Sequence, residues 1–125
     1  MYSIAVKRDF IANHFLIGGD WGRENQPHAH HYVLEVSIAH AELDQHGYLV
    51  DIVDIESVLT LTVEYFQDSL LNDLPEFGGL NPSLEHFCRI IWQKLLEGIK
   101  PPGAGTLCVK LWENDSCWAS YQQQY

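Results

Sequence analysis

The stretch His28-Ala29-His30-His31-Tyr32 runs directly into an alternating series of apolar residues. Residues i and i+2 of a β-strand point to the same face. If this segment is extended, His28 and His30 therefore project side by side, and His31 points to the other face. The face of the histidine pair continues through Tyr32, Leu34, Val36 and Ile38. Two imidazoles on one face supply two of the three ligands of an open three-histidine zinc site.

A third histidine, His14, lies in phase with an earlier apolar alternation that Arg8 alone interrupts. A buried imidazole without partners costs roughly 1–3 kcal/mol, and a metal ion would satisfy one of its nitrogens. We predict a strand over residues 2–17 that brings His14 beside His28 and His30 to complete a zinc site. The alternative is a hydrogen-bonded core histidine, with the clustering a matter of chance among seven histidines.

Length and composition fit one globular domain over residues 1–125, because a chain of this size with 46% hydrophobic residues can bury a real core. No apolar run approaches the roughly 18 residues of a membrane-spanning helix, and the N-terminal charges follow the apolar residues, unlike those of a secretory signal. The three cysteines, Cys88, Cys108 and Cys117, are an odd number and lack Cys-x-x-Cys spacing. This pattern fits reduced thiols. We expect a cytoplasmic protein without a membrane partner.

Seven Lys and Arg stand against 17 Asp and Glu, so the formal net charge is −10. Nucleic-acid binding depends on neutralising phosphates with basic side chains. The charge therefore argues against a nucleic-acid partner. It argues more weakly against a polyphosphate substrate, unless a metal supplies positive charge.

Residues 18–27 have the composition of a loop and lie between the two strands that carry the histidines, so they could cover the site. Residues 28–40 predict the second long strand. A turn follows at 45–47, and residues 48–50 predict a short extended piece.

Two amphipathic helices are predicted next. Apolar residues at steps of three and four from Ile52 predict a helix that ends near residues 70–72, with Asp51 or Asp54 at its start. The second helix begins within Asn81-Pro82-Ser83-Leu84-Glu85, capped by either Asn81 or Ser83. Gly98 and then Pro101-Pro102 end it.

A C-terminal hairpin is predicted with its turn at Asn114-Asp115. Glu113 is its notable residue, because this carboxylate shares a phase with three apolar positions and buried carboxylates are rare unless paired or functional. Glu113 is therefore a candidate ligand-binding residue; the alternative is a solvated residue at the end of a strand. The apolar positions in phase with it are Leu107, Val109 and Leu111.

The resulting order, ββααββ, predicts an α+β fold in which both helices cover one face of a four-stranded antiparallel sheet. Such a sheet has exposed edges. Closed symmetric assembly of several copies would pair those edges.

Six segments in this order resemble motifs of the 6-pyruvoyl-tetrahydropterin synthases and the related 6-carboxytetrahydropterin synthases, and the resemblance covers nearly the whole chain. The segments are Phe10-x-Ala12-x-His14, His28 to Tyr32 (with Ala29 where the family has Gly), Gly47 to Asp51, Leu71-Asn72, Asn81 to Glu85 and Leu111-Trp112-Glu113.

The resemblance implies the tunnelling fold (T-fold) and a homo-oligomer, a trimer or hexamer with active sites between subunits. It implies zinc held by His14, His28 and His30. Glu113 would bind the guanidine-like edge of a pterin, and Ser83 and Glu85 would lie near the same pocket.

Two departures from the family pattern concern proton transfer. The synthases carry a Cys base just ahead of the His-x-His motif, whereas residues 18–27 contain none and Glu24 stands four residues before His28. Phe66-Gln67-Asp68 stands where the family has Leu-Asp-His. Glu24 is the first candidate for a replacement base, since some relatives that cleave the pterin side chain use Glu; the alternative is a solvated loop carboxylate. Asp68, His31 and His86 are weaker candidates.

Three hypotheses about function follow. In the first, the chain is a zinc-dependent enzyme with lyase-type chemistry on dihydroneopterin triphosphate or a related pterin, and Glu24 is its base. In the second, it binds zinc and a pterin or purine-like heterocycle without catalysis. In the third, zinc only stabilises the fold, so that chelation would unfold the chain.

Overall fold

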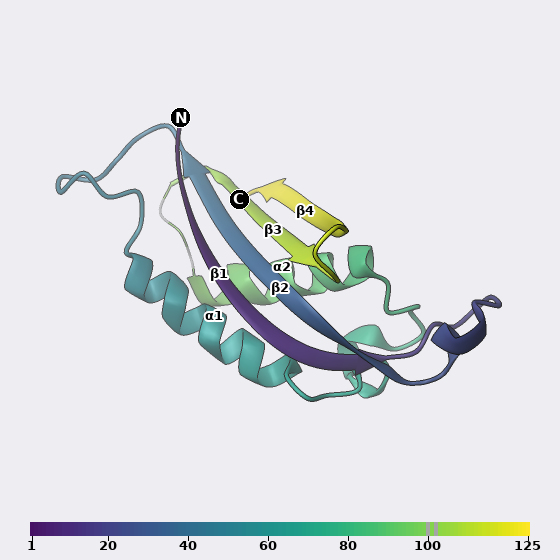
Figure 1. The fold of residues 1–125 in the computed structure, drawn as a ribbon. Coiled ribbons are helices and arrows are strands. Elements are labelled where there is room, and N and C mark those ends of the chain that lie inside the picture. Colours follow the sequence, from purple (N-terminus) through teal and green to yellow (C-terminus); the bar gives the residue numbers. More distant parts are fainter. Residues whose placement is uncertain (100, 102) are drawn as a thin grey trace.

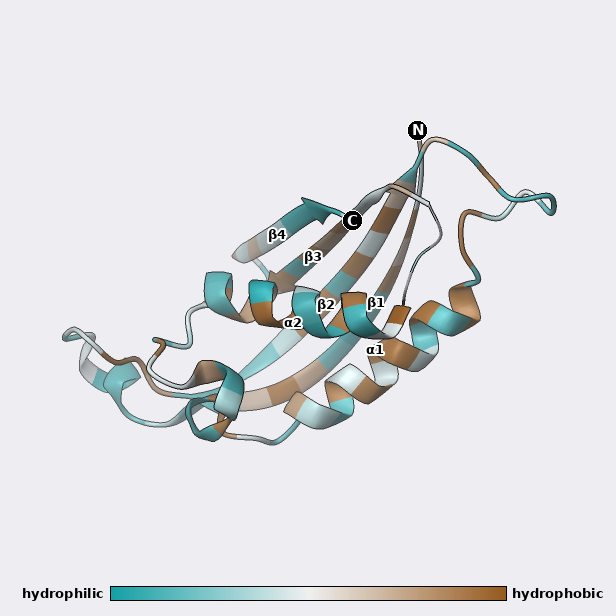
Figure 2. Ribbon diagram, turned by 180° about the vertical axis from the view of Figure 1, so that it is seen from behind, coloured by the Kyte–Doolittle hydropathy of each residue, from teal (hydrophilic) through white to brown (hydrophobic). Residues whose placement is uncertain are grey.

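The computed structural model describes residues 1–99, 101 and 103–125. Its four long strands form one antiparallel sheet in the order β1-β2-β3-β4, and Figures 1 and 2 show both long helices on the same face of that sheet. The predicted α+β, ββααββ architecture is confirmed. The elements are β1 (Tyr2–His14), β2 (His28–His40), α1 (Ile52–Phe66), α2 (Leu84–Ile99), β3 (Thr106–Trp112) and β4 (Trp118–Gln124), with short 3-10 turns at Gly22–Asn25, Leu71–Asp73 and Pro75–Phe77.

The hydrophobic core lies between the sheet and the two helices. Helix α1 packs across β1, and α2 packs across β3 and β4. Figure 2 shows brown, apolar residues recurring along both helices and along the strands. The in-phase residues of β1 and β2 fill it as the alternation predicted. Its aromatic centre consists of Phe10, Tyr32, Phe66, Phe77 and Phe87, each at most 3% exposed.

The register of β1 and β2 brings the predicted metal ligands together. His14 pairs with His28 at the end of the ladder, and His30 follows two residues along β2 on the same face. The ring centroid of Tyr32, in the aromatic core, lies 5.7 Å from that of His30. The histidines therefore stand at one end of the sheet, next to the buried aromatic core.

Two predicted element ends and one predicted extended segment were wrong. Strand β1 ends at His14 rather than residue 17, because the backbone N–H and carbonyl of Phe15 bond the side chain of Asn72 and not a strand. Residues 48–50 form no strand; the N–H of Tyr48 is instead bonded within its own loop, to Asp44 Oδ1. Helix α1 ends at Phe66 rather than near residues 70–72.

The early end of α1 has a tertiary cause. Asp68 has a φ of 60°, and its N–H donates to the carbonyl of Ile11 in β1 at 2.7 Å. Leu70 then forms a bridge to Asn13. Bonding to β1 therefore turns the chain away from the helix axis before the apolar stripe has run out.

The structure selects one start for each helix. Asp51 Oδ1 accepts the N–H of Val53 and caps α1. Ser83 Oγ accepts the N–H of His86 and caps α2, whereas the Asn81 side chain accepts the N–H of Ile17. Helix α2 ends at Ile99, one residue beyond Gly98; Pro102 of the predicted stop lies outside the described residues. Within residues 1–99, 101 and 103–125, no helix is long and apolar enough to cross a bilayer.

Candidate metal centre and adjoining pocket

Three imidazoles converge at the end of β1 and β2. The ring centroids of His14, His28 and His30 lie 4.6 to 4.9 Å apart. One nitrogen from each can be chosen so that all three lie within 4.8 Å of one another. The three residues predicted as metal ligands are thus the three that the fold brings together.

Backbone carbonyls orient two of these rings. His14 Nδ1 donates to the carbonyl of Pro82 at 3.0 Å, and His28 Nδ1 donates to that of Gln26 at 2.8 Å. With the proton on Nδ1, each ring presents the lone pair of Nε2. The Nε2 atoms of His28 and His30 lie 3.1 Å apart. Second-shell bonds of this kind fix the tautomer of metal-binding histidines.

Burial favours the neutral form of His14 and His30. Burial lowers the pKa of His14 from 6.5 to about 4, since the side chain is only 4% exposed, and the nearby histidines lower it further against the opposing bond to Pro82. Burial also lowers the pKa of His30, against the opposing charge of Glu113. Neutral imidazole is the form that binds a metal. The donor set therefore fits zinc, which takes nitrogen ligands and leaves a fourth position open in catalytic sites.

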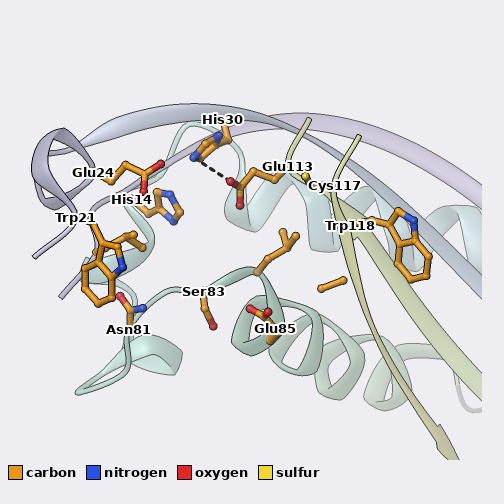
Figure 3. A pocket seen from close by; sticks show the side chains of 13 residues that line it. His14, Trp21, Glu24, His30, Asn81, Ser83, Glu85, Glu113, Cys117 and Trp118 are labelled. Atoms are coloured by element: carbon orange, nitrogen blue, oxygen red, sulfur yellow. Dashed lines mark ion pairs between the residues drawn. The ribbon is translucent and has the colours of Figure 1, made fainter. Parts of the chain in front are cut away.

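A pocket of about 340 Å³ opens beside the histidines. It is bounded by His14 and His30, by the β1–β2 loop, by the start of α2 and by the β3–β4 hairpin (Figure 3). The side chains lining it are His14, Leu16, Trp21, Glu24, His30, Asn81, Ser83, Leu84, Glu85, Glu113, Cys117, Trp118 and Ala119. Such a mixture of apolar walls and a few converging polar groups is typical of small-molecule sites.

The predicted base, Glu24, and the three predicted ligand-binding residues, Ser83, Glu85 and Glu113, line this pocket. Glu113 directly follows β3, with Oε1 4.0 Å from His30 Nε2 (Figure 3). Its side chain is 30% exposed, so it is neither a core residue nor a fully solvated one. Ser83 and Glu85 stand at the N-terminus of α2.

Glu24 reaches the pocket because its loop folds back onto the segment that follows β1. The Glu24 carbonyl accepts the N–H of Leu16 at 2.9 Å. Its carboxylate raises the pKa of both His14 and His30, against the larger effect of burial. A negative charge therefore faces the histidines from the loop.

The weaker candidates for a base lie elsewhere. His31 Nε2 pairs with Asp9 Oδ2 at 2.7 Å on the sheet face that carries no helix. His86 Nδ1 donates to the carbonyl of Asn81. Asp68 follows α1, and, among the described residues, the lining of this pocket includes none of these three.

Sequence reasoning missed several residues of the pocket as site residues. Asn81 entered the sequence argument as a candidate helix cap, but it lines the cavity and ties the β1–β2 loop to the start of α2. Trp21 and Trp118 come from segments read as a loop and a hairpin. Cys117 came only as part of the return strand. The one available sequence clue was the presence of two tryptophans within segments that flank the candidate ligands.

The comparisons with known proteins agree with this geometry. The family model described as 6-pyruvoyl tetrahydropterin synthase matches residues 3–124. A 6-pyruvoyl tetrahydrobiopterin synthase of Dictyostelium discoideum is 33% identical over 82 residues, 64% of this chain and 61% of that protein. A candidate 6-carboxy-5,6,7,8-tetrahydropterin synthase of Archaeoglobus fulgidus is 26% identical over 120 residues, 96% of this chain and 95% of that protein.

Solved structures share the fold. The 6-pyruvoyl tetrahydropterin synthase of Caenorhabditis elegans has a TM-score of 0.80 at 20% identity, covering 98% of this chain and 97% of its own. The Plasmodium vivax enzyme with a catalytic glutamate replaced by alanine has a TM-score of 0.79 at 13% identity, covering 99% of this chain and 98% of its own. The family model spans almost the entire sequence, and the chain therefore belongs to the 6-pyruvoyl tetrahydropterin synthase family.

Proposed function

We propose that this chain is a zinc-dependent, 6-pyruvoyl-tetrahydropterin synthase-like enzyme with lyase-type chemistry on the side chain of dihydroneopterin triphosphate or a related pterin. One observation carries the proposal. A cluster of three histidines, of which His14 and His30 line the pocket, stands beside two carboxylates, Glu24 and Glu113, that reach the same pocket from separate segments. Family membership supports the substrate class.

His14, His28 and His30 would hold the metal. When bound, zinc would polarise an oxygen of the ligand and lower the pKa of a bound water. The bonds from His14 to Pro82 and from His28 to Gln26 hold these rings in place whether or not metal is present, so the site needs little rearrangement to load.

Glu113 would anchor the heterocycle. A carboxylate accepts two parallel N–H bonds from a guanidine-like edge, and such charge-assisted pairs are about twice as strong as neutral ones. The hydroxyl of Ser83 and the carboxylate of Glu85 would bind the remaining polar groups of the ring. Because Glu113 lies 4.0 Å from His30, the anchored ring would lie beside the metal.

Glu24 would act as the general base. A positioned base contributes typically about 10²–10⁴-fold to the rate, and this carboxylate faces the histidines from the opposite side of the pocket to the hairpin that carries Glu113. Two observations support the assignment: the surrounding loop, residues 18–27, contains no cysteine, and a glutamate is the catalytic residue of the Plasmodium vivax relative.

One observation favours a second function, binding of zinc and a pterin or purine-like heterocycle without catalysis. Phe66-Gln67-Asp68 replaces the Leu-Asp-His motif expected from the family resemblance, and Asp68 lies apart from the pocket lining. With only seven basic residues, the chain also offers little charge to hold a triphosphate.

One assay separates these functions. Zinc-loaded protein is incubated with dihydroneopterin triphosphate, products are resolved by chromatography, and binding of a stable pterin is titrated in parallel. Product that falls about 10²-fold or more in Glu24→Gln, but not in the exposed control Glu97→Gln, supports the enzyme. Pterin binding without product supports the second function. Neither binding nor product, together with unfolding on chelation, would leave zinc as a structural element only.

We further infer that residues 1–125 act as one domain in a cytoplasmic homo-oligomer, a trimer or hexamer. Strands β1 and β4 are the edges of the sheet, and unpaired edges invite pairing with another copy. The three free cysteines agree with a reducing compartment. Light scattering on the purified protein tests the assembly, and a monomeric mass would refute it.

A further inference from the structure

The loop between β1 and β2 places a large aromatic side chain, Trp21, at the ligand pocket. The residue is 44% exposed, although an indole is among the costliest groups to leave in water. Figure 3 shows it at the opposite end of the pocket from Trp118, with His14 and Asn81 near it. Metal binding and proton transfer as described above make no use of this ring.

The backbone of Trp21 is held by its own loop. Its N–H donates to Asn25 Oδ1 at 2.7 Å, and its carbonyl accepts the N–H of Glu24. Asn25 Nδ2 in turn donates to the carbonyls of Leu16 and Gly19 at 2.9 and 3.0 Å. A single asparagine therefore ties the loop together at the point where Trp21 leaves it.

The indole itself rests on Gly19. A Cβ built on Gly19 would lie 2.7 Å from Cη2 and 2.9 Å from Cζ3 of Trp21, so a larger residue at this position would displace the indole. Glycine therefore allows the six-membered ring of the indole to lie against the backbone. With its backbone bonded and this end of the ring in contact with Gly19, Trp21 is held in its loop, and less conformational entropy remains to be lost on binding.

The rest of the pocket suits a flat ring. Leu16, Leu84 and Ala119 supply apolar wall, and the polar groups come from the rim: Glu24, Asn81, Ser83, Glu85 and Glu113. Edge recognition by carboxylates fixes the position of a heterocycle in its plane but does not hold its faces. An aromatic side chain at the pocket supplies that missing contact, because every π-face can stack.

We propose that Trp21 stacks on the face of the bound heterocycle and selects planar aromatic ligands over puckered or non-aromatic ones that present the same hydrogen-bonding edge. This inference rests on the proposed pterin site and adds a specificity residue to it. Trp21 then binds the ligand together with Glu113, one through the face of the ring and the other through its edge.

Tyr48 provides the control. It is an exposed aromatic side chain, 62% against 44% for Trp21. It lines a separate pocket with Ile4 and Asp51 and is not part of the ligand pocket lining. Its substitution therefore removes an exposed aromatic ring without touching the proposed ligand site.

The test is a titration of oxidised, planar pterin into zinc-loaded wild type, Trp21→Ala, Trp21→Phe and Tyr48→Ala, with zinc content measured for each. Stacking of a base on an aromatic side chain corresponds to about 10- to 100-fold in affinity. We expect that loss in Trp21→Ala, recovery of most of the affinity in Trp21→Phe, and wild-type affinity in Tyr48→Ala. The loss in Trp21→Ala should be smaller for a puckered tetrahydropterin.

Several results would overturn the inference. Wild-type affinity in Trp21→Ala, or equal losses for planar and puckered ligands, would remove the stacking role and leave the proposed function intact. Absence of pterin binding to the wild type would refute the proposed function and this inference with it. If Trp21→Ala fails to fold, Gly19→Ala decides, because its Cβ displaces the indole while the tryptophan remains; unchanged pterin affinity in that variant would overturn the inference.

Discussion

The two ends of the sheet each carry a pocket, and the larger one is not the candidate active site. The second pocket, about 520 Å³, lies where β1 begins and the β2–α1 loop ends, and its lining includes Asp44, Tyr48 and Asp51. Its carboxylates serve their own loop: Asp44 Oδ1 accepts the N–H groups of His46 and Tyr48, and Asp51 caps α1. In the first pocket, polar groups face the cavity.

The pKa shifts at the two pockets also differ in their physical cause. Bonds from the backbone, that of Tyr48 first, hold the pKa of Asp44 below its usual value on a fully exposed loop. Burial beside a cavity lowers the pKa of His14 to about 4. Local bonding of the first kind stabilises a loop, whereas burial of several titratable groups around one space is characteristic of a site that binds a charged partner. The volume of a pocket does not by itself distinguish a ligand site from a space beside a well-bonded loop.

The largest expected effect is on zinc. His28→Ala removes one of three ligands, and we expect affinity to fall by well over the roughly 10- to 100-fold that loss of a mere second-shell partner causes. His31→Ala is the matched control, because it lies three positions along the same strand and pairs with Asp9 on the other face. Chelator competition gives both affinities; equal losses would refute the three-histidine assignment.

The next effect concerns pH and the metal-free protein. His14 has a folded pKa of about 4 and an unfolded pKa near 6.5, so protons bind the unfolded chain more readily. The free energy of unfolding that His14 contributes is fully present above pH 6.5. It falls by roughly 3 kcal/mol in all as the pH drops from 6.5 to about 4. Chemical denaturation at several pH values should show a shallower decline in His14→Gln, and an identical decline would contradict the assignment.

Glu113→Gln should weaken pterin binding without affecting zinc content. Hydrogen bonds to a charged group contribute about 1.5–3 kcal/mol, which corresponds to about 10- to 150-fold in affinity. Asp51→Asn, at the other pocket, should leave pterin affinity unchanged. Isothermal titration of both variants sharpens the comparison, and equal losses would mean that the ligand does not contact Glu113.

The smallest expected effect is on stability, and it comes from the second pocket. Asp51→Ala removes the cap of α1 and should lower the free energy of unfolding by about 1 kcal/mol, while zinc and pterin affinities stay at wild-type values. Thermal unfolding measures the first quantity and titration the second. A loss of pterin binding in Asp51→Ala would show that the second pocket communicates with the first.

Periodicity predicted the strands and helices because local geometry decides them. Strand alternation placed His14, His28 and His30 on one face, and α1 and α2 appeared where apolar residues recur at steps of three and four. The errors lie where a distant segment overrides the local pattern. Helix α1 stops at Phe66 because the chain bonds to β1, and β1 stops at His14 because Asn72 takes over the backbone of Phe15.

The pocket was less predictable than the histidine cluster. The family resemblance pointed to Glu24, Ser83, Glu85 and Glu113 as site residues. The residue pattern alone singled out only Glu113. Trp21 and Asn81 gave no periodic clue, since both lie in loops whose position depends on hydrogen bonds to residues far away in sequence. Asn81 reaches Ile17 across 64 positions of the chain.

Strand periodicity in the amino-acid sequence was thus enough to place three imidazoles on one face and to specify the layers of the fold, because the two-residue repeat of a strand needs no information from elsewhere. Tertiary packing decided what surrounds them. It brought the β1–β2 loop, the start of α2 and the β3–β4 hairpin to the same end of the sheet, and it left Asp68 outside the pocket lining. Contacts of this range depend on how the layers pack, and no local pattern of residues encodes them.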